Sequence, residues 1–165
     1  QSNLKLANGF CPVVKFIENE VNVALGTDSA ASNNTLDLFS EIKSASLLAK
    51  AVSRDAASLD AHAALRMATI NGAKALAWDN EIGSLELGKQ ADIIAVKIDS
   101  ISQQPPYNPA SQLVYTNSGS QVSHSWVAGK MLLENRKLCT INERSLIQTT
   151  EQWRKKIHSN HEHFD

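Results

Sequence analysis

Residues 21–34 read VNVALGTDSAASNN, a short apolar run that stops at Gly-Thr-Asp and continues in small and polar residues. The β-branched run at residues 21–25 predicts a buried strand. Asp28 follows three residues later, where such a strand would open to solvent. In α/β barrels the active site is formed at the carboxyl ends of the strands. Asp28 is therefore the first candidate for a functional residue.

Two interpretations of Asp28 are open at this point. A carboxylate at the end of a strand can bind a divalent cation, or take a proton from a water molecule that the cation holds. The same side chain can instead accept hydrogen bonds from the turn that follows, as Asp does in Asx-turns. The local residues favour neither interpretation over the other.

The composition is that of a globular chain. Hydrophobic residues make up 42% of the sequence and charged residues 20%. A length of 165 residues is enough for one domain with a core. The formal net charge of −1 gives no electrostatic footprint for nucleic acid or for an anionic membrane surface. No apolar run approaches the length of a membrane span. We therefore expect neither a nucleic-acid partner nor a membrane partner.

The cysteines indicate the redox environment of the protein, and the first residues indicate whether the sequence begins inside a longer chain. Cys11 and Cys139 lie far apart and outside any Cys-x-x-Cys pattern, so a reduced, cytoplasmic setting is the simplest interpretation. Cys11 has no neighbouring cation and is expected to be inert. No signal peptide is visible. The opening residues QSNLKLANGFCP read as the middle of a loop without a starting Met, which predicts a fragment of a longer chain.

Hydrophobic periodicity predicts three helices in the first half of the chain and one near its C-terminal end. Helices are expected at residues 13–20, 36–52, 58–78 and 143–157. Asn34 or Thr35 would cap the second of these helices and Ser58 the third. Glu41 would face solvent. Gly72, after Asn71, is expected to interrupt the third helix, because glycine is unfavourable in a helix interior.

The second half of the chain predicts mostly strands. Strands are expected at residues 92–97, 122–127 and 130–134, in addition to residues 21–25. The last two would form a hairpin around Ala128-Gly129. Three prolines are expected to keep residues 102–109 irregular, because they remove backbone donors and fix φ.

Four separated motifs follow one another in residues 1–136: SNLKLANG with a later Pro, VNVALGTDSAASNN, LRMATINGAKAL and IGSLELGKQAD. Together they resemble the amidohydrolase superfamily, in the branch of 5-methylthioadenosine/S-adenosylhomocysteine deaminases, guanine deaminases and triazine chlorohydrolases. The chain departs from the family at Leu87, where Pro is frequent, and near Asn135-Arg136, where Gly is frequent. Both departures affect turns and leave Asp28 untouched.

The resemblance implies an α/β fold in three parts. Residues 1–77 would be the last strand–helix units of a metal-dependent (β/α)8 barrel, that is, the C-terminal portion of the barrel. Residues 78–142 would be a segment of a small flanking β-sandwich domain. Residues 143–165 would be a C-terminal helix and tail.

The resemblance also implies a site. Asp28 would be the last metal-site residue, at the end of the eighth barrel strand, where it holds a divalent ion, in the first place Zn²⁺, and handles the proton of the attacking water. Ser29, Ser32 and Asn33 would lie in the loop beside the substrate pocket. Because such a metal needs three or more protein ligands, a His-x-His pair, further histidines and a general acid/base Glu are expected upstream of this chain.

The implied activity is hydrolytic deamination of a purine nucleoside-type ring, as in the methylthioadenosine/S-adenosylhomocysteine class. A triazine-type chlorohydrolase or aminohydrolase and a guanine deaminase are the alternatives within the superfamily. A non-catalytic binding module with the same fold is an alternative of another class. The chain alone is expected to be inactive, and to associate as a homo-oligomer or with the remaining N-terminal part of the barrel, because apolar barrel faces would be exposed.

The histidines in the chain are not expected to be metal ligands. His62 lies in the Ala-rich helix and His124 in a predicted strand, which is typical of packing or surface residues. His158, His161 and His163 have ligand-like spacing, but a polar terminal tail is usually just solvated.

Overall fold

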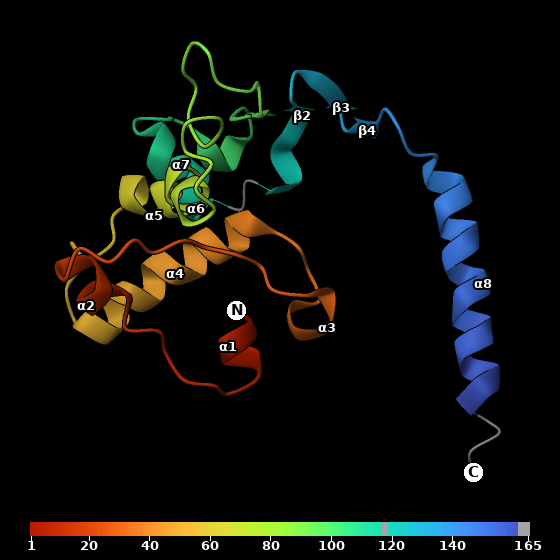
Figure 1. The fold of residues 1–165 in the computed structure, drawn as a ribbon, viewed down its shortest axis with the longest axis horizontal. Coiled ribbons are helices and arrows are strands. Elements are labelled where there is room, and N and C mark those ends of the chain that lie inside the picture. The colour runs from red at the N-terminus through yellow and green to blue at the C-terminus, as the bar shows by residue number, and fades with distance from the viewer. Residues whose placement is uncertain (117–118, 162–165) are drawn as a thin grey trace.

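The computed structural model describes residues 1–116 and 119–161 (Figure 1). The helices are α1 (Ser2–Lys5), α2 (Val13–Glu18), α3 (Ala30–Asn33), α4 (Leu38–Ser53), α5 (Ala61–Met67), α6 (Ile70–Ala75), α7 (Pro109–Tyr115) and α8 (Glu143–His161). Two 3-10 turns are η1 (Ile101–Gln103) and η2 (Gly119–Gln121). The strands are β1 (Ile93–Val96), β2 (Val122–Val127), β3 (Lys130–Glu134) and β4 (Lys137–Leu138).

The core of the helical part forms around α4. Apolar side chains from α4, α5 and α7 pack into one buried cluster that includes Ile42, Ala49, Ala61, Ala64, Met67, Ala110 and Val114. The many alanines leave room for the helices to approach closely. Ser46, which is fully buried within this cluster, donates to the Leu59 carbonyl at 2.8 Å and shares a hydrogen bond with the Tyr115 hydroxyl. The core therefore fixes α4, on which part of the candidate site is built.

The prediction of a strand at residues 21–25 is wrong for this structure. None of the described strands pairs with this segment, and its backbone is held to α5 and α6 instead. Leu25 N donates to the Met67 carbonyl at 3.0 Å, and the Asn71 amide donates to the Val23 carbonyl at 3.1 Å. A β-strand is defined by backbone bonds to a neighbouring strand, so an apolar β-branched sequence alone is not sufficient.

The Ala-rich stretch forms two helices instead of one, and the break differs from the prediction. It falls at Ala68-Thr69, whereas Gly72 lies inside α6. The Thr69 hydroxyl donates to the Leu65 carbonyl at 2.8 Å, a local bond that competes with the helical backbone pattern. The cap is also different: Asp60 accepts from Ala63 N at 2.8 Å, and Ser58 is not the N-cap.

The ends of other elements were also mispredicted. The helix expected at residues 36–52 is α4, but its N-cap is Asp37, which accepts from Phe39 N at 3.0 Å, and neither Asn34 nor Thr35. The irregular segment expected at residues 102–109 is irregular only over residues 104–108, since residues 102–103 belong to η1 and α7 begins at Pro109. Neither α7 nor β4 was predicted.

The predicted hairpin is confirmed within an antiparallel sheet of order β1-β2-β3-β4. Ala128 and Gly129 connect β2 to β3, and both take positive φ angles, 49° and 75°, as a type I′ turn requires. Ala128 N also donates to the Asp92 carboxylate at 2.7 Å. This bond ties the hairpin to the segment that leads into β1.

The C-terminal helix is confirmed as α8, which runs to His161 and stands away from the other helices in Figure 1. Its large apolar side chains are exposed: Leu146, Ile147, Trp153 and Ile157. No helix in the described part of the chain combines the length and the apolar character needed to cross a bilayer. The division of the chain at residues 77 and 142 stays a prediction.

Candidate metal-binding site

Asp28 lies between the extended segment and α3. Its backbone takes a positive φ of 62°, and its side chain accepts two hydrogen bonds from the residues that follow. Ser32 Oγ donates to Asp28 Oδ2 at 2.6 Å, and Ser29 N donates to Oδ1 at 2.7 Å. The Ser32 hydroxyl first, and then the Ser29 amide, hold the pKa of the Asp28 carboxyl below its ordinary value of 3.8. The side chain is therefore ionised at neutral pH.

The chemistry of Asp28 fits one ligand of a divalent ion. Each carboxylate oxygen has two lone pairs, and the two hydrogen bonds use one on each oxygen. The side chain is exposed, so the remaining lone pairs are accessible. Within residues 1–116 and 119–161, no group of three or more His, Cys, Asp and Glu side chains is arranged to hold a metal ion. Asp28 is thus a candidate for a single ligand.

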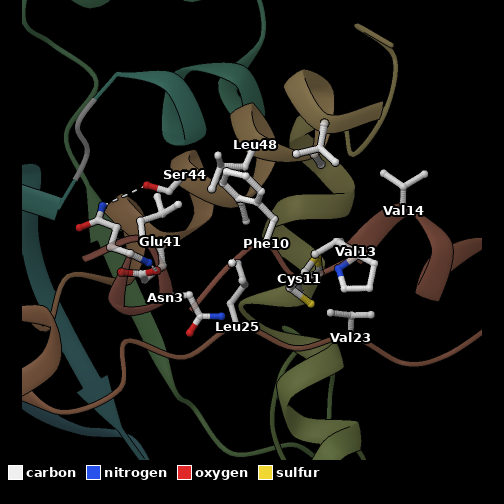
Figure 2. Close-up of a pocket in the computed structure, with 18 of the residues that line it drawn as sticks. Asn3, Phe10, Cys11, Val13, Val14, Val23, Leu25, Glu41, Ser44 and Leu48 are labelled. Atoms are coloured by element: carbon white, nitrogen blue, oxygen red, sulfur yellow. Dashed lines mark hydrogen bonds and ion pairs between the residues drawn. The ribbon is translucent and has the colours of Figure 1, made fainter. Parts of the chain in front are cut away.

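A cavity of about 610 Å³ opens beside Asp28 (Figure 2). Its wall comes from residues 1–18, from the extended segment and from one face of α4. Most of the side chains that the figure labels in this wall are apolar: Phe10, Val13, Val14, Val23, Leu25 and Leu48. Asp28 and Glu41 add carboxylates to this apolar wall. Such a space can accept a flat apolar group while presenting acidic side chains to it.

The three loop residues predicted beside the pocket take different positions. Ser29 caps α3, and Ser32 donates to Asp28. Asn33 is buried, and its amide donates to the Thr27 carbonyl at 2.6 Å and to Glu41 Oε1 at 2.7 Å. Among the described residues, Asp28 lines the cavity and these three do not. A direct role of Ser29, Ser32 or Asn33 with substrate stays a prediction.

Glu41 was predicted to face solvent, and this is wrong. Glu41 is only 6% exposed, and it lines the same cavity as Asp28. The sequence does contain a signal for this, because apolar residues follow at helical spacing along α4, at Ala45, Leu48 and Val52. Glu41 is therefore the first residue of an apolar stripe, one that helical spacing could have revealed.

His62, His124 and Cys139 do not line the cavity, whereas Cys11 does. His62 is exposed on α5. His124 stacks on Trp126 with ring centroids 5.6 Å apart, which confirms it as a packing residue. Cys11 and Cys139 are free thiols. His163 and the side chain of His161 lie outside the described residues.

Comparison with known proteins decides the family. The sequence pattern of the Amidohydrolase family matches residues 1–132. The chain belongs to the amidohydrolase family. Its mixed helix-and-strand fold matches solved amidohydrolase-type structures over more than nine-tenths of the chain.

Three relatives of this amidohydrolase chain are informative. A 5-methylthioadenosine/S-adenosylhomocysteine deaminase of Teredinibacter turnerae is 52% identical over 157 residues, which cover 95% of this chain and 36% of the relative. An adenosine deaminase of Xanthomonas campestris with bound zinc is 47% identical, with a TM-score of 0.93 over 96% of this chain and 36% of that structure. An atrazine chlorohydrolase of Arthrobacter aurescens complexed with zinc is 26% identical, with a TM-score of 0.84 over 92% of this chain and 34% of that structure. The chain thus spans about a third of the length of these proteins.

Proposed function

We propose that this chain is the C-terminal part of a metal-dependent aminohydrolase that deaminates a purine nucleoside-type ring. The observation that carries the proposal is an ionised carboxylate, Asp28, at the wall of a mainly apolar cavity. The identity to a methylthioadenosine/S-adenosylhomocysteine deaminase and the likeness to an adenosine deaminase support the same class of substrate. The substrate class is a small molecule of the nucleoside type, such as methylthioadenosine.

The finer architecture belongs to the same proposal. Residues 1–77 would be the last units of a (β/α)8 barrel, residues 78–142 a segment of a flanking β-sandwich, and residues 143–165 a C-terminal helix and tail. The extended segment at residues 21–25 would then be the eighth barrel strand, and it would gain its neighbours from the remaining N-terminal part of the barrel. Leu25 and Val23 already line the cavity, as residues of an inner barrel strand do.

Zn²⁺ is the divalent metal that we propose for the site, since both structural relatives named above were solved with zinc. When it is bound, such an ion lowers the pKa of its water ligand toward about 7 and so supplies hydroxide at neutral pH. Asp28 would hold the ion with an oxygen that keeps a free lone pair. The remaining ligands and the general acid/base Glu would come from outside the described residues.

The hydrogen bonds of Asp28 bear on its second role. Because Ser32 and Ser29 stabilise the ionised carboxylate and lower its pKa, Asp28 stays ionised at neutral pH, available to a cation, and binds a proton only weakly. A proton that it accepts from water is therefore readily passed on, as is required of a residue that both holds an ion and moves a proton.

The size and character of the cavity are compatible with a nucleoside. Small-molecule pockets commonly measure about 300–1,000 Å³ and are mainly apolar with a few polar groups, and this cavity of about 610 Å³ lies within that range. Phe10 and Leu48 would offer apolar surface to a flat ring. The rest of the barrel would narrow and close this space.

A triazine-type hydrolase is the second candidate, favoured by the structural likeness to the atrazine chlorohydrolase. The two candidates differ in the leaving group, ammonia for the deaminase and chloride for the chlorohydrolase. The lower identity, 26% against 47% for the adenosine deaminase, makes it the weaker proposal.

A substrate panel on the full-length protein with zinc tests the proposal. The panel contains methylthioadenosine, S-adenosylhomocysteine, adenosine, guanine and a chlorotriazine, with ammonia and chloride release as readouts. We expect ammonia from methylthioadenosine or S-adenosylhomocysteine, and no turnover by the 165-residue chain alone. Chloride release from the triazine only would favour the second candidate. A metal-loaded protein that turns over none of the five would favour a non-catalytic binding module.

A further inference from the structure

Glu41 is a buried carboxylate, only 6% exposed. Asn33 Nδ2 donates to Glu41 Oε1 at 2.7 Å. The terminal ammonium of Gln1 lies 2.6 Å from Glu41 Oε2, a charged contact that would not persist in the longer protein proposed above, where Gln1 carries a peptide N–H. Burying a carboxylate is unfavourable unless donors compensate it. The Asn33 amide is the side-chain donor that makes the buried position tenable.

Asn33 links this buried carboxylate to the backbone beside Asp28. Its Nδ2 has two hydrogens; one goes to Glu41 Oε1 at 2.7 Å and the other to the Thr27 carbonyl at 2.6 Å. The Ser2 hydroxyl also donates to the Thr27 carbonyl, at 3.3 Å. Thr27 directly precedes Asp28, so these bonds fix the peptide that carries the Asp28 side chain.

The backbone of Asp28 lies in the left-handed region, at a φ of 62°, which Asp adopts more readily than most residues because its short side chain bonds locally. Ser32, the neighbour of Asn33 on α3, holds the carboxylate itself through its 2.6 Å hydrogen bond. Asn33 therefore anchors α3 and the backbone, while Ser32 orients the side chain.

From this arrangement we propose that Glu41 and Asn33 are a positioning pair for the Asp28 carboxylate. Glu41, fixed on the long helix α4, holds the Asn33 amide, and Asn33 holds the Thr27 carbonyl. The pair keeps the Asp28 side chain in the orientation that a metal ion requires. This inference rests on the proposed function, in which Asp28 is a metal ligand. It gives Asn33 a supporting role in place of contact with substrate, since its side chain is buried and both of its donor hydrogens are used.

Zinc affinity of the metal-free full-length protein tests the pair. Asn33→Ala removes both amide bonds. Glu41→Met keeps a side chain of similar length but removes both acceptor oxygens, so that the Asn33 amide loses its partner on α4. Loss of a group that supports a metal ligand typically weakens metal binding by about 10–100-fold. We expect a rise of that size in the zinc Kd of Asn33→Ala, and a rise in the same direction for Glu41→Met, measured by competition with a chelator.

Gln103 supplies the matched control. It is also a buried amide, 1% exposed, that donates to Thr116 Oγ1 at 3.1 Å and to Gln121 Oε1 at 2.7 Å. Gln103→Ala should lower thermal stability while its zinc Kd stays within about twofold of the parent, because a general loss of stability does not reorient Asp28. This comparison separates positioning from a merely structural role.

The possible results are distinguishable. If the parent binds no zinc, or Asp28→Ala keeps the parent affinity, the proposed function itself is wrong. If the parent binds zinc through Asp28 but folded Asn33→Ala and Glu41→Met bind it within twofold of the parent, the positioning pair is wrong. Should Asn33→Ala fail to fold, Glu41→Met decides, since an apolar side chain of similar length suits the mainly apolar wall of the cavity.

Discussion

Asp28 and Glu41 line the same cavity but differ in what surrounds them. Asp28 is exposed, and its carboxylate accepts from Ser32 and Ser29 in its own loop. Glu41 is buried, and its Oε1 accepts from the Asn33 amide. Two carboxylates near one cavity can thus have different roles, one accessible to a ligand and one that supports the backbone.

Removing the Ser32 hydroxyl should raise the pKa of Asp28. Ser32 is the largest cause of the lowered pKa, so Ser32→Ala should move it back toward 3.8. Since the folded-state pKa is depressed, the carboxylate contributes stability above the unfolded-state pKa and loses it as pH falls through the folded-state value. In the variant the total loss is smaller and is complete at a higher pH, because the folded-state pKa lies closer to the unfolded-state value. Titration of the Asp28 carboxyl carbon by NMR measures the shift.

Asp55 is an internal control for that titration. Its pKa is also lowered, by the Ala57 amide and then by the Ser58 hydroxyl, and neither group contacts Ser32. The Asp55 titration should therefore be unchanged in Ser32→Ala. An unmoved Asp28 pKa in the same spectra would show that Ser32 does not stabilise the ionised form.

Gly83 and Gly88 predict a difference in stability between two alanine substitutions. Both have similar positive φ angles, 90° and 93°. A Cβ at position 83 would lie 2.7 Å from Ala73 Cβ and 2.9 Å from Ile70 Cα, whereas one at position 88 meets nothing within 4 Å. Gly88→Ala should cost about 1 kcal/mol from backbone strain. Gly83→Ala should cost about 1–3 kcal/mol more, because overpacking against α6 is added.

Denaturant unfolding of the full-length protein, followed by a probe on the C-terminal part, measures both variants. The order of the two midpoints is the result that matters. Equal losses for the two variants would mean that the turn at Gly83 moves away from α6 without cost, in conflict with the close packing in the structure.

At the scale of elements, the capping residue of α5 can be tested. Asp60 accepts from Ala63 N at 2.8 Å, and loss of an N-cap of this kind costs about 1 kcal/mol, within a range of 0.5–2. Asp60→Ala should therefore lower the free energy of unfolding by that amount. Asp60→Asn keeps a side-chain acceptor and should retain most of the stability that the cap contributes. If both variants lose equal stability, the effect comes from charge and not from capping.

Much of the element pattern could be predicted from sequence, and the exceptions have physical reasons. The stripe of α4, the β2–β3 hairpin and α8 follow from local periodicity. The choice of Asp37 over Asn34 or Thr35 as a cap does not, because several good capping residues stand close together and tertiary packing selects one. The extended segment at residues 21–25 has a strand-like sequence, but strand formation depends on partners that sequence periodicity does not specify.

Part of the candidate site could likewise be predicted from sequence, and part could not. Asp28 could be identified from its place after an apolar run and from the resemblance to amidohydrolases. The charge of Glu41 predicts an exposed residue, whereas the apolar residues that follow it at helical spacing indicate the burial that the structure shows. The bonds of Asn33 could not be predicted, since they depend on how α3 and α4 meet in three dimensions.

At the scale of the whole molecule, the 165-residue chain should associate when isolated. Large apolar side chains near the cavity and the extended segment are exposed, among them Leu4, Phe10, Ile17 and Val21. Several exposed large apolar side chains in one part of the chain favour contact with another chain or chain segment. Light scattering should give a mass above that of one chain. A monodisperse monomer would contradict this expectation.

In the full-length protein we propose that the remaining part of the barrel covers these side chains, and that the protein forms a homo-oligomer. The aliphatic and aromatic residues of α8 offer a second exposed surface. Light scattering on the full-length protein would test the oligomer, and a single-chain mass would argue against it.

Whether Asp28 is a metal ligand is decided by the zinc content of full-length Asp28→Ala, measured beside the parent after identical loading and dialysis. We expect about one zinc ion per parent chain at the site and a large loss of zinc in the folded variant. Equal zinc content in the two proteins, with the variant still folded, would contradict Asp28 as a metal ligand.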